Sequence, residues 1–198
     1  MSHPPALGLL LLTGGQGRRL GGPKHPRSHP SGCSWGGHLV EVFSTVSPKG
    51  PIQILGEPLP DRPDLYSLPD EGLGAAAALI QWAARSAPKA KRWWVVACDQ
   101  VRWTPALLRV WLETAERHDP TETKWIVAIA QERLQPLGGF LPGDLRGRMV
   151  GLDVVRIRDL VRALPNMPLK WDSPVWDDVD TPADLARWEG GSPHGGTP

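Results

Sequence analysis

The chain has 198 residues, of which 22 are Lys or Arg and 21 are Asp or Glu, so its formal net charge is +1. This length suits one domain, and the near-neutral charge argues against nonspecific nucleic-acid binding, which needs a basic excess. Two cysteines, Cys33 and Cys98, are too few for a disulfide framework or a four-cysteine zinc site. The apolar run at residues 7–12 is far shorter than the roughly 18 residues of a membrane span, and it lacks the features of a signal peptide. We therefore expect a cytoplasmic protein with no membrane or nucleic-acid partner.

Short apolar runs alternate with helical patterns along the chain. The expected strands are residues 6–13, 51–55, 91–99, 124–130, 134–141 and 175–179. The expected helices are residues 38–46, 75–86, 105–118, 154–164 and 182–188. This alternation predicts an α/β fold with a mostly parallel sheet flanked by helices. Residues 1–189 are expected to form a single domain, and residues 190–198 a disordered tail rich in Gly and Pro.

A glycine-rich loop at residues 14–24 follows the first expected strand. Glycines let backbone N–H groups approach phosphate oxygens closely, and Arg18, Arg19 and Lys24 add three cations to the same loop. Ligands of parallel sheets bind at the carboxyl ends of the strands, where this loop lies. The loop therefore predicts an anion-binding site, although composition alone equally allows a solvated surface loop.

Two familiar phosphate-binding loops do not fit the spacing. A Walker A loop ends in Gly-Lys-Ser/Thr, whereas Pro23 precedes Lys24 and His25 follows it. The dinucleotide fingerprint requires a glycine three residues after Gly17, where Leu20 stands instead. The loop must therefore belong to another class of anion site, if it binds an anion.

Acidic residues follow two of the expected strands. Asp99 ends an apolar strand, where a buried charge is costly unless it faces a cleft or a cation. Helix capping is the alternative for Asp99, but Thr104 lies nearer to the helix that begins at Pro105. Asp180 would share a strand face with Asp178, or it could cap the helix after Thr181. Asp177 and Asp178 are expected to be solvated.

Four potential metal ligands lie within fourteen residues, at His25, His29, Cys33 and His38. Their spacing matches no standard zinc template, and the segment is rich in Pro, Ser and Gly. We expect an irregular loop here rather than a zinc site. Cys98 is expected to be a buried strand residue.

Five segments, in order, resemble motifs of the molybdenum cofactor guanylyltransferases and related nucleotidyltransferases. They are Leu11-Leu-Thr-Gly-Gly-Gln-Gly-Arg-Arg-Leu-Gly-Gly-Pro-Lys24, Asp70 with Gly72–Ala77, Cys98-Asp99, Gln135-Pro-Leu137 and Asp178–Leu185. The chain departs from the family pattern at Thr13, Pro23, Ala75-Ala76 and Gln100-Val101, where alanine, an acid, a proline-leucine pair and an apolar-proline pair are usual. The resemblance spans residues 7–188.

The resemblance implies a Rossmann-like, glycosyltransferase-A-like fold and a Mg²⁺-dependent reaction. In that reaction GMP passes from GTP to the phosphate of molybdopterin, and pyrophosphate leaves. The implied catalytic residues are Arg19, Lys24 and Asp99, and the implied metal ligands are Asp99 and Asp180. The implied nucleotide contacts are Leu12, Thr13, Gly14, Gly15, Arg18, Lys24, Asp70 and Asp99. The departures leave open another nucleotide or acceptor, as in cytidylyltransferases, or a non-catalytic nucleotide-binding protein that retains the fold.

Overall fold

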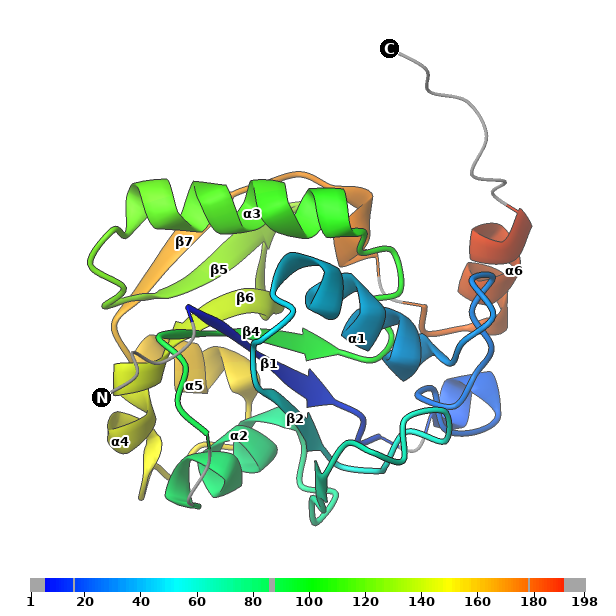
Figure 1. Cartoon of the computed structure of the whole chain (residues 1–198), viewed down its shortest axis with the longest axis horizontal. Helices are drawn as coiled ribbons and strands as arrows, with labels where there is room; N and C mark the ends of the chain where they lie inside the picture. The colour runs from blue at the N-terminus through cyan, green and yellow to red at the C-terminus, as the bar shows by residue number, and fades with distance from the viewer. Residues whose placement is uncertain (1–5, 16, 86–87, 178, 191–198) are drawn as a thin grey trace.

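The computed structural model describes residues 6–15, 17–85, 88–177 and 179–190. Its strands are β1 (Leu7–Leu12), β2 (Ile52–Leu55), β3 (Ser67–Leu68), β4 (Arg92–Ala97), β5 (Trp125–Ala130), β6 (Arg133–Pro142) and β7 (Asn166–Lys170). They form one sheet in the order β3-β2-β1-β4-β6-β5-β7 (Figure 1). Only β6 runs antiparallel to its neighbours, β4 and β5, among the described strands. The predicted Rossmann-like, mostly parallel sheet is confirmed.

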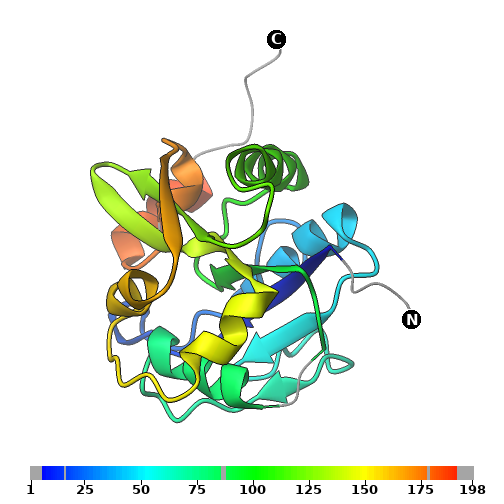
Figure 2. The same cartoon turned by 90° about the vertical axis from the view of Figure 1, so that its left-hand side faces the viewer.

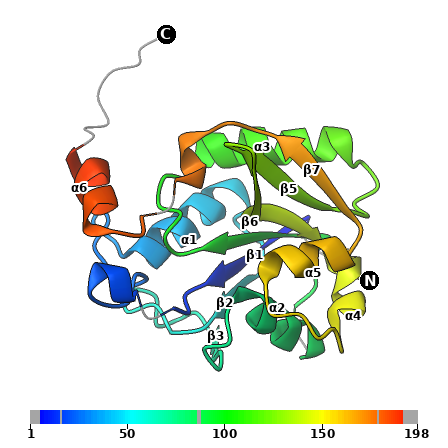
Figure 3. The same cartoon turned by 180° about the vertical axis from the view of Figure 1, so that it is seen from behind.

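Helices cover both faces of this sheet (Figures 1 and 2). They are α1 (Trp35–Val46), α2 (Ala75–Ala84), α3 (Pro105–His118), α4 (Arg146–Met149) and α5 (Ile157–Ala163). Helix α6 (Pro182–Gly190) lies to one side of the sheet, where its Leu185 and Trp188 pack against Leu20 and Trp35 (Figure 1). Strand β1 contributes side chains to the apolar cores on both faces of the sheet, since successive side chains of a strand point to opposite faces. Leu9 and Leu11 pack into a core with α1 and α3, whereas Leu10 and Leu12 pack into a second core with α2 and α5. Seen from behind, α2, α4 and α5 lie in front of the sheet (Figure 3).

The prediction of a last strand at residues 175–179 is wrong. Residues Pro174–Trp176 form a 3₁₀ helix, which Ser173 caps by accepting a hydrogen bond from the backbone N–H of Val175. The sheet edge is occupied instead by β7, which contains Pro168 and is only partly buried. A proline is tolerated on an edge strand because it has no N–H to donate to the ladder. Without a continuous apolar run, β7 gave no strand signal in the sequence.

Helix ends also differ from expectation, and the causes are local. The helix expected at residues 38–46 begins at Trp35, because Ser34 caps it by accepting from the N–H of Gly37. Glycine has a low helix propensity, so the glycines of this first turn give no helix signal in the sequence. A glycine is nevertheless suited to position 36, because a Cβ at Gly36 would clash with Leu59. The helix expected at residues 154–164 is the shorter helix α5. The predicted cap of α3 by Thr104 is confirmed. Residues 191–198 of the expected tail lie outside the described residues. No described helix is both long enough and apolar enough to cross a membrane.

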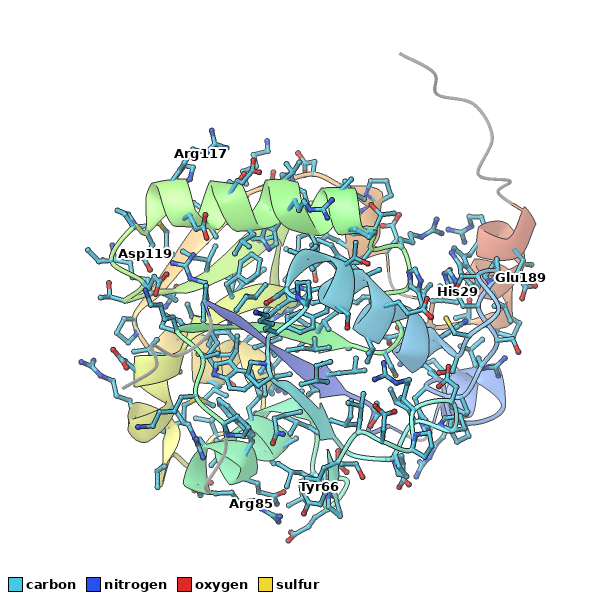
Figure 4. All side chains as sticks on the ribbon, in the orientation of Figure 1. His29, Tyr66, Arg85, Arg117, Asp119 and Glu189 are labelled. Atoms are coloured by element: carbon cyan, nitrogen blue, oxygen red, sulfur yellow. The ribbon has the colours of Figure 1, made fainter. Side chains whose placement is uncertain are left out.

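A buried ion pair joins the start of β4 to the end of α3, where Asp119 lies (Figure 4). Arg92 and Asp119 are 2% and 3% exposed, and the guanidinium of Arg92 donates to the backbone carbonyl of Asp119 at 2.8 Å. The carboxylate of Asp119 also accepts from the backbone N–H of Lys124 at 2.8 Å. Asp119→Ala should lower the free energy of unfolding by about 3 kcal/mol, since it leaves a buried guanidinium without its counter-charge. Urea denaturation measures the loss, and Asp64→Ala, at an exposed pair, should change little.

The same pair makes stability depend on acid pH. Burial alone would raise the pKa of Asp119, but the hydrogen bonds from Lys124 and Thr121 and the charge of Arg92 outweigh it and hold the pKa below its usual 3.8. A lowered pKa in the folded state stabilises the protein above the unfolded-state pKa, and the contribution is lost as pH falls through the folded-state value. The difference in the free energy of unfolding between wild type and Asp119→Ala should therefore shrink as pH falls below 3.8. If the difference between the two melting temperatures stayed constant down to pH 2.5, which is roughly one unit below the usual pKa of an aspartic acid, this prediction would be wrong.

A candidate active site at the carboxyl ends of strands β1 and β4

The glycine loop and Asp99 meet because their strands are neighbours. β1 and β4 pair in parallel with Leu12 opposite Ala97, so the segments that follow both strands emerge at the same edge of the sheet. The chain continues from β1 to β2 on one side, while β4 lies on the other. Such a switch in strand order opens a crevice in which ligands of α/β proteins bind. A cavity of about 540 Å³ lies here.

Most of the predicted site residues line this cavity. They are Leu12, Gly14, Gly15, Arg18, Arg19, Lys24, Asp70, Asp99 and Asp180. Further lining residues, which were not among the predicted contacts, are Gly17, Gly72, Gly74, Ala75, Ala97, Cys98 and Leu137. Segments far apart in the sequence therefore contribute to one site.

Lys24 lies at the centre of the charged groups. Its ammonium donates to Oδ2 of Asp99 at 2.7 Å and to Oδ1 of Asp180. The side chains of Lys24 and Asp99 are 14% and 18% exposed, whereas Asp180 is 45% exposed. Arg19 reaches the other oxygen of Asp180 at 3.8 Å from the solvent side. The ammonium thus holds together two carboxylates from distant parts of the chain.

The carboxylates keep Lys24 charged. Burial by itself lowers the pKa of this amine, but the negative charges of Asp99 and Asp180 and their hydrogen bonds outweigh it and raise the pKa. The site therefore carries one fixed positive charge between two acids at neutral pH. A divalent cation could take the place of the ammonium if Lys24 swung toward an anionic ligand.

The loop that carries Lys24 is folded around its glycines. Gly17 has a φ of 54°, and its carbonyl accepts from the N–H groups of Leu20 at 2.8 Å and Gly22 at 3.2 Å. A Cβ at Gly17 would clash with the carbonyl of Gly22. Gly14 is less confined, because a Cβ there would meet the end of the Asp70 side chain rather than backbone. These glycines let the backbone turn tightly and keep it bare toward the cavity.

Asp70 lies beside the glycine loop and lines the same cavity as Gly14. Its Oδ1 accepts from the backbone N–H of Gly72 at 2.9 Å, which fixes the turn that leads into α2. Gly74 and Ala75, at the start of α2, also line the cavity. The acid and the glycine turn that precede α2 therefore lie at the cavity.

Asp180 does not cap the last helix. Thr181 does so, because its hydroxyl accepts from the N–H of Asp184 at 3.2 Å while the carboxylate of Asp184 accepts from the N–H of Thr181 at 2.9 Å. This reciprocal pair is a capping box, and it leaves the carboxylate of Asp180 for Lys24. Asp178 lies outside the described residues, and Asp177 is exposed, as expected.

Thr13 and Gln100, two departures from the family pattern, have structural contacts. Thr13 is buried and is not among the lining residues, since its hydroxyl donates to the backbone carbonyl of Glu57 at 2.6 Å. Gln100 is also buried, and its amide donates to the carbonyl of Leu137 at 3.3 Å. Gln100 thereby holds the Leu137 segment at the cavity. Cys98 is buried as expected, and burial raises the pKa of its thiol.

Comparison with known proteins identifies the family. Residues 9–167 match the model of the MobA-like NTP transferase domain. No curated protein sequence matches the chain.

Three solved structures illustrate the fold. Rv0371c from Mycobacterium tuberculosis H37Rv, in complex with manganese, has a TM-score of 0.65 at 20% identity, covering 94% of this chain and 99% of that one. Molybdopterin-guanine dinucleotide biosynthesis protein A from Archaeoglobus fulgidus has a TM-score of 0.64 at 18% identity, covering 92% and 97%. 2-C-methyl-D-erythritol 4-phosphate cytidylyltransferase from Thermus thermophilus has a TM-score of 0.61 at 16% identity, covering 93% and 98%. At these identities the likeness concerns the fold.

Proposed function

Because the chain belongs to the family of MobA-like NTP transferase domains, which are nucleotidyltransferases, we propose that it transfers GMP from GTP to the phosphate of molybdopterin. One observation carries the proposal: a cationic glycine loop and two carboxylates converge on one cavity around Lys24. The similarity to a molybdopterin-guanine dinucleotide biosynthesis protein supports this choice of nucleotide and acceptor.

The chemistry requires charge neutralisation more than a protein nucleophile. A phosphate oxygen of the acceptor bonds to the α-phosphorus of GTP, and the bond from that phosphorus to the bridging oxygen breaks, so that pyrophosphate leaves. The barrier arises from the repulsion of the two anions and from their alignment. Arg18, Arg19 and Lys24 supply positive charge at the cavity, and the bare backbone of the glycine loop supplies N–H donors. Asp70 is the proposed acceptor for hydrogen bonds from the base or ribose.

The residues present fit a divalent cation. Asp99 and Asp180 already converge on one cation, the ammonium of Lys24, and carboxylates with phosphate oxygens are the ligands that Mg²⁺ prefers. Asp99 and Asp180 would hold the ion, with Asp99, the less exposed, as the principal ligand. A bound Mg²⁺ supplies neutralisation of the phosphates and polarisation of the reacting phosphorus. The manganese complex of the Rv0371c structure supports a divalent ion in this fold.

Guanine nucleotides should stabilise the protein more than adenine, cytosine or uracil nucleotides. At a concentration about a hundred times the dissociation constant, mass action adds about 2.7 kcal/mol to the free energy of unfolding. A thermal-shift series with the four nucleoside triphosphates, each with and without Mg²⁺, measures this. Equal shifts with all four would refute guanine selectivity, and a larger shift with CTP would favour a cytidylyltransferase.

Product formation tests the function itself. Incubation with Mg²⁺, GTP and molybdopterin should release pyrophosphate, and omission of either substrate should prevent the release. Molybdopterin guanine dinucleotide should accumulate in equal amount. Nucleotide binding without pyrophosphate release, with every pair of nucleotide and acceptor tried, would instead identify a non-catalytic nucleotide-binding protein.

A further inference from the structure

Three potential metal ligands from the segment after the glycine loop lie together beside α6. The ligand atoms of His29, Cys33 and His38 all lie within 4.8 Å of one another, and the three residues are half-buried. Figure 4 shows His29 next to α6, and its ring lies 5.3 Å from that of Trp188 in this helix. His25, the fourth candidate in the sequence, is not part of this group.

The local backbone brings these residues together. The N–H of His29 donates to the carbonyl of Cys33 at 2.8 Å, and an antiparallel bridge joins Ser28 to Ser34 around this hairpin. Gly32, with a φ of 92°, makes the tight turn. Helix α1 begins directly after the hairpin and places His38 one turn beyond its cap. The spacing matches no zinc template because a hairpin and a helix, rather than one regular element, present the ligands.

The rings of His29 and His38 stack on each other, with centroids 3.7 Å apart and an interplanar angle of 10°, so one ring must turn before both can bind the same ion. Nε2 of His38 bonds the backbone carbonyl of Trp103 at 3.0 Å, and this bond fixes one end of the ring. A metal-binding histidine is commonly fixed in this way through its second nitrogen. The hydroxyl of Ser31 lies 2.8 Å from Nδ1 of His29 and 3.0 Å from the sulfur of Cys33, so it links the other two potential ligands.

We propose that His29, Cys33 and His38 form a Zn²⁺ site, separate from the carboxylates of the nucleotide cavity. Two imidazoles and a thiolate suit zinc, whereas Mg²⁺ prefers oxygen. Tetrahedral bonds of ~2.0 Å to nitrogen and ~2.3 Å to sulfur set the ligand atoms roughly 3.3–3.8 Å apart. The observed grouping within 4.8 Å is close to this requirement. On binding, the Cys33 thiol loses its proton to solvent, and its sulfur forms the bond to zinc.

The fourth position can be filled from α1. The thiol of Cys33 donates to Oε2 of Glu41 at 3.7 Å, so this carboxylate already lies beside the sulfur. With water or Glu41 as the fourth ligand, zinc would fasten the hairpin to α1. The hairpin begins at Ser28, a few residues after Lys24, so the ion would restrict the segment that leaves the glycine loop.

Metal titration tests the site without any assay of activity. The purified protein, treated with chelator and reductant, should bind one Zn²⁺ per chain in competition with a chromophoric chelator. Co²⁺ in its place should give the intense near-ultraviolet absorption of a thiolate–cobalt bond. Removing one ligand, in Cys33→Ser, His29→Ala or His38→Ala, should weaken zinc binding more than a hundredfold, since changes beyond the ligands alone cost about 10–100-fold.

Matched variants separate this site from others in the chain. His118→Ala, at the exposed end of α3, should bind zinc like wild type, and so should the double variant Asp99→Asn/Asp180→Asn. Circular dichroism of the metal-free proteins shows whether each variant folds, and wild type with Cys33 alkylated provides a ligand-blocked sample that needs no substitution. Less than one zinc per chain at micromolar affinity, or equal zinc binding by wild type, Cys33→Ser and His38→Ala, would overturn the proposal.

Discussion

Asp99→Asn should lower turnover at least about a hundredfold while leaving the protein folded. The loss follows from removing one charge where the transferring phosphates must be neutralised, and single groups of this kind are worth about 10²–10³ in rate. Asparagine has the same shape, and its amide oxygen can still accept from Lys24, which now donates at 2.7 Å. The melting temperature should therefore change little. Pyrophosphate release at saturating GTP and Mg²⁺ measures the effect.

Asp180→Asn provides the matched comparison. This carboxylate is 45% exposed, against 18% for Asp99, so solvent screens more of its charge. The same isosteric change at Asp180 should cost less activity than at Asp99, and it leaves the capping pair of Thr181 and Asp184 intact. Near-normal Mg²⁺-dependent turnover in Asp99→Asn, or a larger loss in Asp180→Asn, would contradict the proposed order of the two ligands.

Lys24→Ala should have opposite effects on two ligands. Nucleotide binding should weaken tenfold to a hundredfold, because a charge-assisted contact to phosphate contributes roughly 1.5–3 kcal/mol. Mn²⁺ binding without nucleotide should strengthen, because the ammonium that now pairs with Asp99 and Asp180 no longer competes for them. Calorimetry with GTP, and electron paramagnetic resonance of free Mn²⁺, measure the two changes.

Lys49→Ala is the control for the loss of a lysine, since Lys49 is exposed and does not line the cavity. It should match wild type for both ligands. If Lys24→Ala bound GTP as tightly as wild type, the assignment of the glycine loop to the phosphates would be wrong. If its Mn²⁺ affinity did not rise, the ammonium would not be a competitor of the metal.

Much of the site could be predicted because it depends on strand ends. The strands Leu7–Leu12 and Arg92–Ala97 are almost wholly apolar, Arg92 being the one charged residue in them, and such strands are buried in parallel sheets. Once both strands are parallel neighbours, the glycine loop and Asp99 must meet at one edge. The order of the motifs along the chain therefore indicated most of the lining residues before their contacts were known.

The remaining features depend on contacts that sequence patterns do not encode. The partnership of Lys24 with Asp180 joins residues 156 positions apart. The hydroxyl of Thr13 points away from the cavity because it donates to the carbonyl of Glu57, in the loop after β2. The side chain of Gln100 is held by its hydrogen bond to the carbonyl of Leu137, in the antiparallel strand β6. The group of His29, Cys33 and His38 arises from a hairpin within a segment whose composition predicts an irregular loop.

A crystal structure with Mn²⁺ and a non-hydrolysable GTP analogue would show where the nucleotide and the metal bind, since anomalous scattering locates the ion. We expect the ion to lie between the triphosphate and the carboxylates of Asp99 and Asp180, bound directly or through one water. We also expect the ammonium of Lys24 to contact a phosphate oxygen instead of lying between the two acids. An ion beyond water-bridging distance of both carboxylates, or a triphosphate bound away from the glycine loop, would contradict these expectations.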